Sequence, residues 1–313
     1  MLPPYFLVGS DRMTSISKEI LEKYQVRKTK KQKTAFIEFM RAHFPKARVE
    51  EGGFPGNRNI VIGDPDTAKA VFGAHYDTQA VMPLPNFVMP KCPILSILYA
   101  FVLIIPMAIF AVLVGKVADA VFSGPTLASL LVMLTYFGTL FLMIAGPANK
   151  HTANDNTSGV ITLIELMSAM TEEERAQSCF VFFDNEEKGL FGSAFFAKEH
   201  KETMKEKLLV NFDCVSDGDY LMLIGSKKAF EHAENLKTAF ADVTGKTVLI
   251  ENAKGVYYPS DQKNFKKSVG VAAFKKSKFG LYLDRIHTPK DTVMDERNIS
   301  VLVSGFIKFT ETL

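Results

Sequence analysis

The sequence predicts an α/β protein whose mixed, mostly parallel central sheet is flanked by helices and interrupted by a two-helix transmembrane hairpin. Three observations predict this fold class. Short apolar runs alternate with stretches of helical periodicity, as they do in parallel sheets that are covered on both faces. Several of these runs end in polar residues, and two long stretches between residues 91 and 150 carry no charge.

The first expected element is a helix over residues 14–44, where apolar side chains recur at helical spacing. A second helix is expected from Val160 to Met170. The expected strands are short apolar or β-branched runs, and they cover residues 48–51, 59–62, 68–74, 178–183, 208–213, 220–224, 248–250 and 270–274. Residues 1–90 and 147–313 are therefore expected to form one discontinuous domain, into which residues 91–146 are inserted.

The inserted segment contains two apolar stretches, Pro93–Gly115 of 23 residues and Pro125–Gly146 of 22 residues, which the nine residues 116–124 connect. At about 1.5 Å per residue, each stretch is long enough to cross a hydrocarbon core of about 30 Å. The alternative is a pair of buried core helices, but both stretches are apolar on every face, whereas a core helix usually keeps a polar stripe. The sequence therefore predicts contact with a lipid bilayer through residues 93–115 and 125–146.

Both ends of a hairpin emerge on one side of a membrane. Lys91 and Lys150 flank this end, whereas Lys116 near the tip is balanced by Asp119, so the positive-inside rule favours the cytoplasm for the domain. Residues 1–20 lack the basic start and long apolar core of a secretory signal, and the three cysteines indicate no disulfide framework. Both observations agree with a cytoplasmic domain, and the periplasmic or lumenal side is the alternative.

The charge of the chain gives little support to a nucleic-acid partner, because the net charge is only +3. The densest basic stretch is residues 27–33. It has two interpretations, contact with anionic lipid headgroups and a solvated face of the N-terminal helix. The solvated face is the favoured interpretation.

Five strand ends or loops each carry side chains that bind metals, namely His75 with Asp77, Asp155, Glu186 with Glu187, Asp213, and His287. One such residue alone is more often a structural hydrogen-bonding group, but five in one chain are hard to attribute to chance. Imidazole and carboxylate are zinc ligands, and two zinc ions about 3.5–4 Å apart need a carboxylate that bridges them. Because residues i and i+2 of a strand face the same way, Asp77 is placed to hold the second nitrogen of the His75 imidazole.

These residues stand in motifs that resemble those of the M28 family of zinc peptidases. The motifs begin at His75, Asn154, Asp184, Asn211 and His287, and they read HYDT, NDNTSG, DNEEKGLFGS, NFD and HTPKDT. Their order and spacing match the family from about residue 15 to the C-terminus, apart from the inserted hairpin. The resemblance implies a zinc-peptidase/phosphorylase-like fold and a metallopeptidase that hydrolyses peptide bonds and acts as an aminopeptidase.

The resemblance also implies two Zn²⁺ ions as cofactor, with other divalent metals as the alternative. The resemblance implies that Asp155 bridges the two ions. It implies that His75 and Asp213 complete one metal site, and that Glu187 and His287 complete the other. Glu186 is expected to be the general base, which takes a proton from the nucleophilic water and passes it to the leaving amine. Asp77 is expected to orient His75.

One segment departs from the family pattern. Residues 257–262 resemble a Ser-Asp-His segment near the active site, but Gln262 replaces the histidine. That position is not a metal ligand in the family, so the departure bears on substrate positioning or on support of the oxyanion. Tyr257, Tyr258 and Asp261 are candidate contacts to the substrate or the oxyanion, and core packing is the equally weighted alternative for the tyrosines.

Two other functions stay open. Glutaminyl cyclases resemble this family but use a single zinc to cyclise N-terminal glutamine, whereas the complete set of five ligands favours two metals. The second alternative is a catalytically inactive membrane scaffold. The retained general base and the five retained ligands argue against it. The hairpin begins after His75 and ends before Asp155, so we expect it to hold the mouth of the active site close to the bilayer.

Overall fold

The computed structural model describes residues 13–122 and 124–313. At its centre is a mixed sheet of nine strands in the order β1-β2-β4-β3-β5-β8-β6-β7, with β9 paired to β8. The strands are β1 (Arg48–Gly52), β2 (Asn57–Ile62), β3 (Ala70–His75), β4 (Ser178–Phe183), β5 (Leu208–Phe212), β6 (Tyr220–Gly225), β7 (Thr247–Asn252), β8 (Ser268–Ser277) and β9 (Gly280–Tyr282). All eight predicted strands are confirmed, β4 with the predicted ends and the other seven with shifted ends, and β9 is the additional strand. Residues 1–12, on which part of the signal-peptide expectation depends, lie outside the described residues.

The direction of the strands explains where a site forms. Strands β4, β3, β5 and β8 are parallel neighbours at the centre of the sheet. The pairs β1–β2 and β2–β4 at one side and β6–β8 at the other are antiparallel. The chain passes from β3 to β4 on one side and then returns to β5 on the other side of β3. Such a reversal leaves a crevice at the carboxyl ends of the strands, where open α/β sheets bind ligands.

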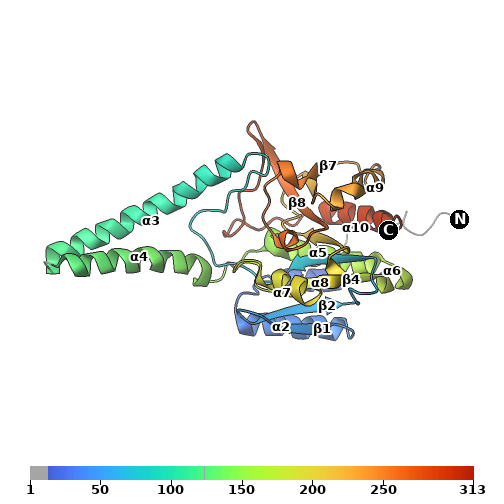
Figure 1. Ribbon diagram of the computed structural model, residues 1–313, viewed down its shortest axis with the longest axis horizontal. Helices are drawn as coiled ribbons and strands as arrows, with labels where there is room; N and C mark the ends of the chain where they lie inside the picture. Colours follow the sequence, from blue (N-terminus) through green and yellow to red (C-terminus); the bar gives the residue numbers. More distant parts are fainter. Residues whose placement is uncertain (1–12, 123) are drawn as a thin grey trace.

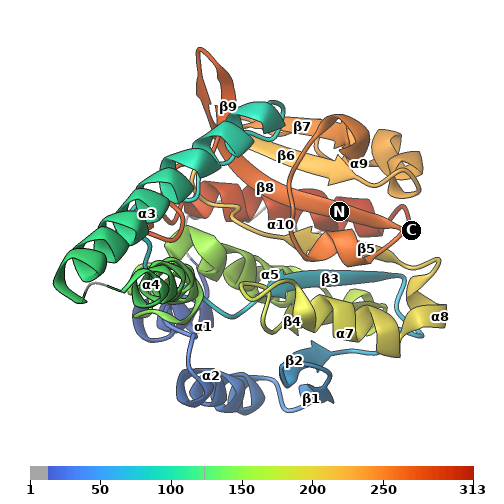
Figure 2. The ribbon, with the colours of Figure 1, turned by 60° about the vertical axis from the view of Figure 1, so that its left-hand side comes forward.

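Helices cover both faces of this sheet (Figures 1 and 2). They are α1 (Ser15–Lys23), α2 (Lys30–His43), α5 (Gly159–Ala169), α6 (Glu172–Ala176), α7 (Phe191–Glu199), α8 (Lys201–Met204), α9 (Ala233–Ala239) and α10 (Glu296–Thr310). Helix α5 confirms the prediction for residues 160–170. The prediction of one helix over residues 14–44 is wrong, because Thr29 starts a new helix: its hydroxyl accepts the Gln32 N–H while the Gln32 side chain accepts the Thr29 N–H.

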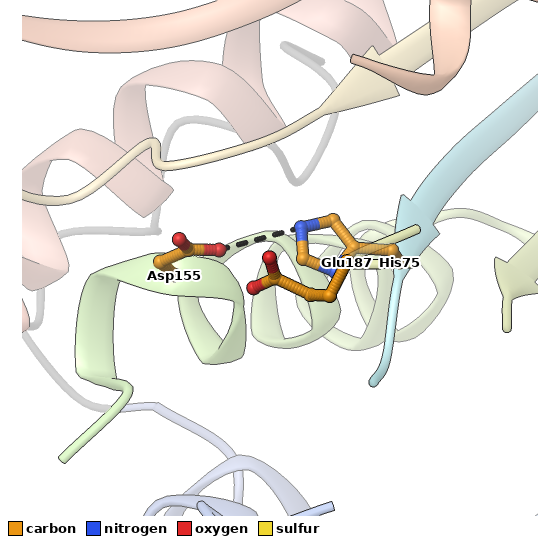
Figure 3. A group of neighbouring side chains, drawn as sticks. All are labelled: His75, Asp155 and Glu187. Atoms are coloured by element: carbon orange, nitrogen blue, oxygen red, sulfur yellow. Dashed lines mark ion pairs between the residues drawn. The ribbon is translucent and has the colours of Figure 1, made fainter. Parts of the chain in front are cut away.

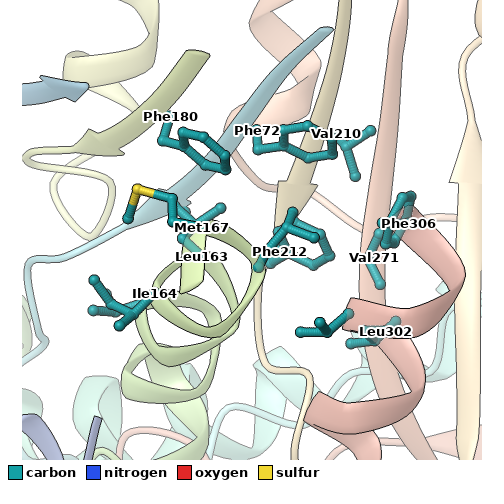
Figure 4. Packing of buried hydrophobic residues seen from close by; sticks show 14 of the residues in the cluster. Phe72, Leu163, Ile164, Met167, Phe180, Val210, Phe212, Val271, Leu302 and Phe306 are labelled. Carbon is teal, nitrogen blue, oxygen red and sulfur yellow. The ribbon is translucent and has the colours of Figure 1, made fainter. Parts of the chain in front are cut away.

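Apolar side chains of the strands alternate between two core layers. Phe72 and Ala74 of β3 join the layer under α5 and α10, whereas Val71 joins the opposite layer under α7. Figure 4 shows the first layer, where Phe72 lies beside Phe180 and near the rings of Phe212 and Phe306. Each fully buried side chain of this size contributes about 1.5–3 kcal/mol, so these layers hold the strand ends in place.

The inserted segment forms two long helices, α3 (Pro93–Phe122) and α4 (Pro125–Ala145). Figure 1 shows them projecting together from one side of the domain and meeting at a tip. Both are long and apolar enough to cross a membrane. In the most apolar 18-residue stretch, 6% of the residues of α3 and 0% of those of α4 are buried. The alternative of a buried core pair therefore does not hold. The predicted connection over residues 116–124 is too long, because α3 continues to Phe122, and Ser123 lies outside the described residues.

Small residues let the two helices approach closely. The buried residues of α3 are Ala111, Gly115 and Ala118, a spacing that puts them on one helix face. A Cβ atom on Gly115 would lie 2.3 Å from Cγ2 of Val132 in α4. Close packing through small residues is typical of helices in membranes, where no hydrophobic effect drives their association.

Candidate metal centre

The carboxyl ends of three neighbouring parallel strands bring the predicted site residues together. His75 is the last residue of β3, Asp213 follows β5, and Glu186 and Glu187 lie in the loop after β4. Asp155 lies in the turn that leads into α5, and His287 in the loop after β9. Because these strand ends share one edge of the sheet, side chains that are far apart in the sequence meet there.

Asp155 lies between two groups of side chains. Its Oδ1 is 3.4 Å from Nε2 of His75, which is 3.6 Å from Oδ1 of Asp213. Its Oδ2 is 2.9 Å from Nε2 of His287, which is 3.3 Å from Oε2 of Glu187. Figure 3 shows Asp155 and Glu187 beside the ring of His75. Each oxygen of one carboxylate thus faces a separate pair of one histidine and one carboxylate.

The chemistry of these groups suits zinc. Ligand atoms of His75, Asp155 and Glu187 lie within 4.8 Å of one another, as do those of His75, Glu186 and Asp213. Oε1 of Glu187 and Oδ1 of Asp213 are buried and have no hydrogen-bond partner among the described residues. An unpartnered buried carboxylate oxygen is costly, and a cation placed between the groups removes that cost. Imidazole and carboxylate are the ligands that catalytic zinc sites use.

The charges in this cluster shift one another's titration. Burial would lower the pKa of His75, but Glu186, Asp155 and Asp213 together raise that pKa well above its usual value. Burial would raise the pKa of Asp155, but hydrogen bonds from His287 and His75 hold it below its usual value. Asp155 is therefore an ionised carboxylate, as a metal ligand has to be.

Asp77 connects two of the loops that form the site. Its Oδ1 accepts the backbone N–H of Glu186 at 2.9 Å, and its Oδ2 accepts that of Glu187 at 3.3 Å. Its Oδ1 is also 3.7 Å from Nδ1 of His75, which lies 3.2 Å from the Asp77 carbonyl oxygen. Asp77 therefore fixes His75 and the two glutamates relative to each other.

Sequence reasoning assigned no role to Asp291, which holds the Asp155 turn. Its carboxylate accepts the backbone N–H groups of Asn154 at 2.8 Å and of Asp155 at 3.0 Å. Burial and the nearby Asp155 carboxylate raise the pKa of Asp291 to about 8. The available signal was its place in the HTPKDT motif, four residues after His287.

Glu186, which is partly buried, and Asp261, which is buried, are two acidic side chains near His75. Burial raises the pKa of Glu186 well above its usual value, and the charges of Glu187 and Asp261 add to this effect while His75 opposes it. Burial also raises the pKa of Asp261 to about 7. Both oxygens of Asp261 are buried, and within the part of the chain that the structure describes neither has a hydrogen-bond partner. A carboxyl group whose pKa lies near neutrality can exchange protons at the working pH.

The remaining residues of the 257–262 segment have other contacts. The hydroxyl of Tyr258 donates to the carbonyl of Asp213 at 3.1 Å, and its ring packs edge-on against Phe274, as in the core-packing alternative. Tyr257 is 47% exposed. Gln262 accepts from Asn211 at 3.0 Å and donates to the carbonyl of Tyr258 at 2.9 Å, so its side chain supports the strand ends.

Comparison with known proteins identifies the family. A sequence profile described as "Peptidase family M28" matches residues 134–305, more than half of the chain. The chain belongs to peptidase family M28. The matched region contains Asp155, the glutamate pair, Asp213 and His287. His75 and Asp77 precede it, and strand β3 places them at the same site. No curated protein matches the sequence.

Solved structures share the M28 fold at low sequence identity. A glutaminyl cyclase from Porphyromonas gingivalis is 12% identical with a TM-score of 0.58, and the alignment covers 97% of this chain and 99% of that one. A Zn-dependent exopeptidase from Parabacteroides distasonis is 12% identical with a TM-score of 0.55 and 94% coverage of both chains. The LapA aminopeptidase of Legionella pneumophila is 13% identical with a TM-score of 0.52, covering 95% and 68%. The predicted fold class is confirmed, and the family contains peptidases and related enzymes.

Arg27 and Lys33 of the basic run are buried inside this M28 domain, so neither interpretation of residues 27–33 holds for these two residues. The guanidinium of Arg27 donates to the carbonyl of Tyr76 at 2.5 Å and to Oγ1 of Thr157 at 3.2 Å. Lys33 forms an ion pair with Asp184, and both side chains are at most 5% exposed. These cations are internal because they satisfy buried acceptors beside the site.

The segments that connect the hairpin to the M28 domain run along the candidate metal centre. The Met82 N–H donates to the carbonyl of His287, and the Val81 N–H donates to that of Pro147, both at 2.8 Å. The Tyr257 N–H donates to the carbonyl of Pro90 at 2.8 Å. The base of the hairpin is thus hydrogen-bonded to the loop that carries His287.

Proposed function

We propose that this M28 chain is a membrane-associated peptidase with two zinc ions that releases N-terminal residues from peptides. One observation supports the two-metal proposal most directly. The two oxygens of Asp155 face two separate pairs, His75 with Asp213 and His287 with Glu187. A single carboxylate between two ligand pairs is what a bridged pair of zinc ions needs.

The residues of the chain would divide the reaction between them. When bound, zinc lowers the pKa of a coordinated water and polarises the scissile carbonyl. Glu186, whose pKa burial raises, accepts the proton of the attacking water and delivers it to the leaving amine. Asp77 holds the Glu186 and Glu187 backbone and the His75 ring in position. Asp261 is a candidate contact to the substrate or to Glu186.

The hairpin is proposed to span the bilayer, with the M28 domain on the cytoplasmic side. Its helices are exposed and apolar along their length, and its base is bonded to the His287 loop. This arrangement would hold the mouth of the site near the membrane surface and favour apolar or membrane-derived peptides. Deletion of residues 91–146 tests the idea, since a soluble enzyme with unchanged peptide preference would leave the hairpin only an anchoring role.

The test of the chemistry is a metal-dependent assay of the full chain on aminoacyl, N-blocked and N-terminal glutaminyl peptides. Release of free N-terminal residues, loss of activity on blocked peptides and two zinc ions per chain by native mass spectrometry are the expected results. Cyclisation of glutamine with one zinc would instead assign a glutaminyl-cyclase reaction. The inactive-scaffold alternative would be favoured if the zinc-loaded protein turned over none of these peptides and Glu186→Gln changed nothing in the assay.

A further inference from the structure

We propose that a cationic pocket beside the base of α4 binds the phosphate of an anionic lipid headgroup. The pocket has a volume of about 500 Å³. It lies between the start of α2, the β1–β2 turn and the loop after β4. Its charged lining residues are Lys28, Lys30, Lys33, Arg58 and Lys188, with Glu51 and Asp184 as the acidic ones. The inference rests on the proposed placement of the hairpin in a bilayer.

The positive charge of this pocket is mostly uncompensated. Lys33 and Asp184 neutralise each other. The guanidinium of Arg58 donates to neutral acceptors, Oγ1 of Thr34 at 2.8 Å and the carbonyl of Lys30 at 3.2 Å. Within the described ranges 13–122 and 124–313, no ion pair involves Lys28, Lys30, Arg58 or Lys188, and Glu51 is the one lining carboxylate left to oppose them.

Two of these cations lie close enough to repel each other. Burial and the charge of Lys188 lower the pKa of Lys28. An anion bound between them relieves this repulsion and accepts charge-assisted hydrogen bonds. The α2 helix also begins at Lys30 and is 14 residues long. The N-terminal end of its dipole adds positive potential at the same place.

The position of the pocket selects a lipid over a soluble anion. The ammonium of Lys28 donates to the carbonyl of Ile144, in the last turn of α4. This is the end of the apolar span, so in a bilayer it lies at the level of the headgroups. Basic residues next to a membrane span bind anionic headgroups in the same way. The pocket therefore opens where lipid phosphates are concentrated.

The test is native mass spectrometry of the full chain in detergent micelles that contain phosphatidylcholine and phosphatidylglycerol in equal amounts. The wild-type protein is expected to retain phosphatidylglycerol preferentially. Lys30→Gln and Lys188→Gln are each expected to weaken that binding about fivefold, because one cation near an anionic surface has an effect of this size. Lys198→Gln, which changes an exposed lysine of α7 outside the pocket, is the matched control and should bind as wild type.

Competition with inorganic phosphate distinguishes the two sources of the anion. If millimolar phosphate displaces the lipid and binds as tightly, the pocket is a soluble-anion site and the lipid proposal is overturned. Equal retention of both lipids, or equal losses in Lys198→Gln and the pocket variants, also overturns it. Because the readout is bound lipid in micelles, it depends neither on peptidase activity nor on the hairpin crossing a bilayer, so those failures are seen separately.

Discussion

The candidate metal centre and the hairpin are each stabilised, but by opposite kinds of contact. At the centre, buried polar groups hold one another from several parts of the chain, as when Asp77 accepts two backbone N–H groups and Asp291 accepts two more. In the hairpin, large apolar side chains such as Phe110, Phe137 and Phe141 are more than half exposed, and contact depends on small residues. The difference indicates that the centre is organised internally, whereas the hairpin is completed by its surroundings.

The largest effect is expected at Glu186, the proposed general base. Glu186→Gln keeps the shape of the side chain but removes its proton-accepting carboxylate, so kcat should fall about 10²–10⁴-fold. Turnover of an aminoacyl-amide by the zinc-loaded enzyme is the measurement, with zinc content as the check on folding. A variant that keeps wild-type kcat would remove Glu186 from the mechanism.

A buried ion pair beside the centre should control stability. Lys33→Met leaves the Asp184 carboxylate buried without its partner, which costs about 3–5 kcal/mol of unfolding free energy. Lys31→Met changes an exposed lysine of the same helix and should cost almost nothing. Urea unfolding compares the two variants, and equal costs would contradict the internal role of Lys33.

Support of Asp155, the proposed bridging residue, should affect metal affinity more than folding. Asp291→Asn weakens the acceptor of two backbone N–H groups in the Asp155 turn, and loss of such support typically lowers metal affinity about 10–100-fold. Competition with a chelator measures this change. Asp242→Asn, at a side chain that is 84% exposed, is the control, and a loss of the same size there would contradict the assignment.

In the hairpin, two glycines provide a matched comparison. Gly115→Leu forces a side chain against Val132, whereas a Cβ atom on Gly138 has no neighbour within 4 Å. Overpacking of this kind costs about 1–3 kcal/mol, so only Gly115→Leu should lower the thermal midpoint of the hairpin in detergent. Turnover of a short soluble peptide should be unchanged in both. Equal effects on the midpoint would show that the helices do not pack at Gly115.

The smallest effect concerns a pair far from both regions. Nε2 of His200 lies 3.0 Å from Oε2 of Glu50. The hydrogen bond that the His200 ring donates to Glu50 raises the pKa of His200 above 6.5. Burial would raise the pKa of Glu50, but His200 lowers it below 4.5.

The signs of these two shifts define a pH window for the pair. The contribution of His200 to the free energy of unfolding is fully present below pH 6.5 and is lost as the pH rises through the pKa of His200 in the folded state. The contribution of Glu50 to the same free energy is fully present above pH 4.5 and is lost as the pH falls through the lowered pKa of Glu50 in the folded state. The stability difference between wild type and His200→Gln should therefore be largest near pH 5.5 and decrease by pH 8. Urea midpoints across this range measure it, and a flat difference would contradict the pairing.

Much of the fold and of the candidate site follows from local patterns. The runs that end at His75, Phe183 and Phe212 are apolar because these strands are buried on both faces. The lengths of the two apolar stretches likewise predicted the hairpin. Apolar spacing alone does not show the helix break at residues 24–29, because the apolar positions up to Tyr24 and from Phe36 onward both recur at helical spacing and residues 25–35 carry few apolar side chains. The local signal of the break is the capping pair of Thr29 and Gln32.

By itself, the sequence determined which residue types stand at the ends of which strands, because strand burial and metal chemistry constrain neighbouring residues directly. Only the tertiary structure decided which oxygen of Asp155 faces which histidine, and that Tyr258 donates to a backbone carbonyl. It alone placed Lys33 inside, against Asp184, which is 151 residues away. Such pairings depend on how strands are ordered in the sheet, and no local pattern of residues encodes that order.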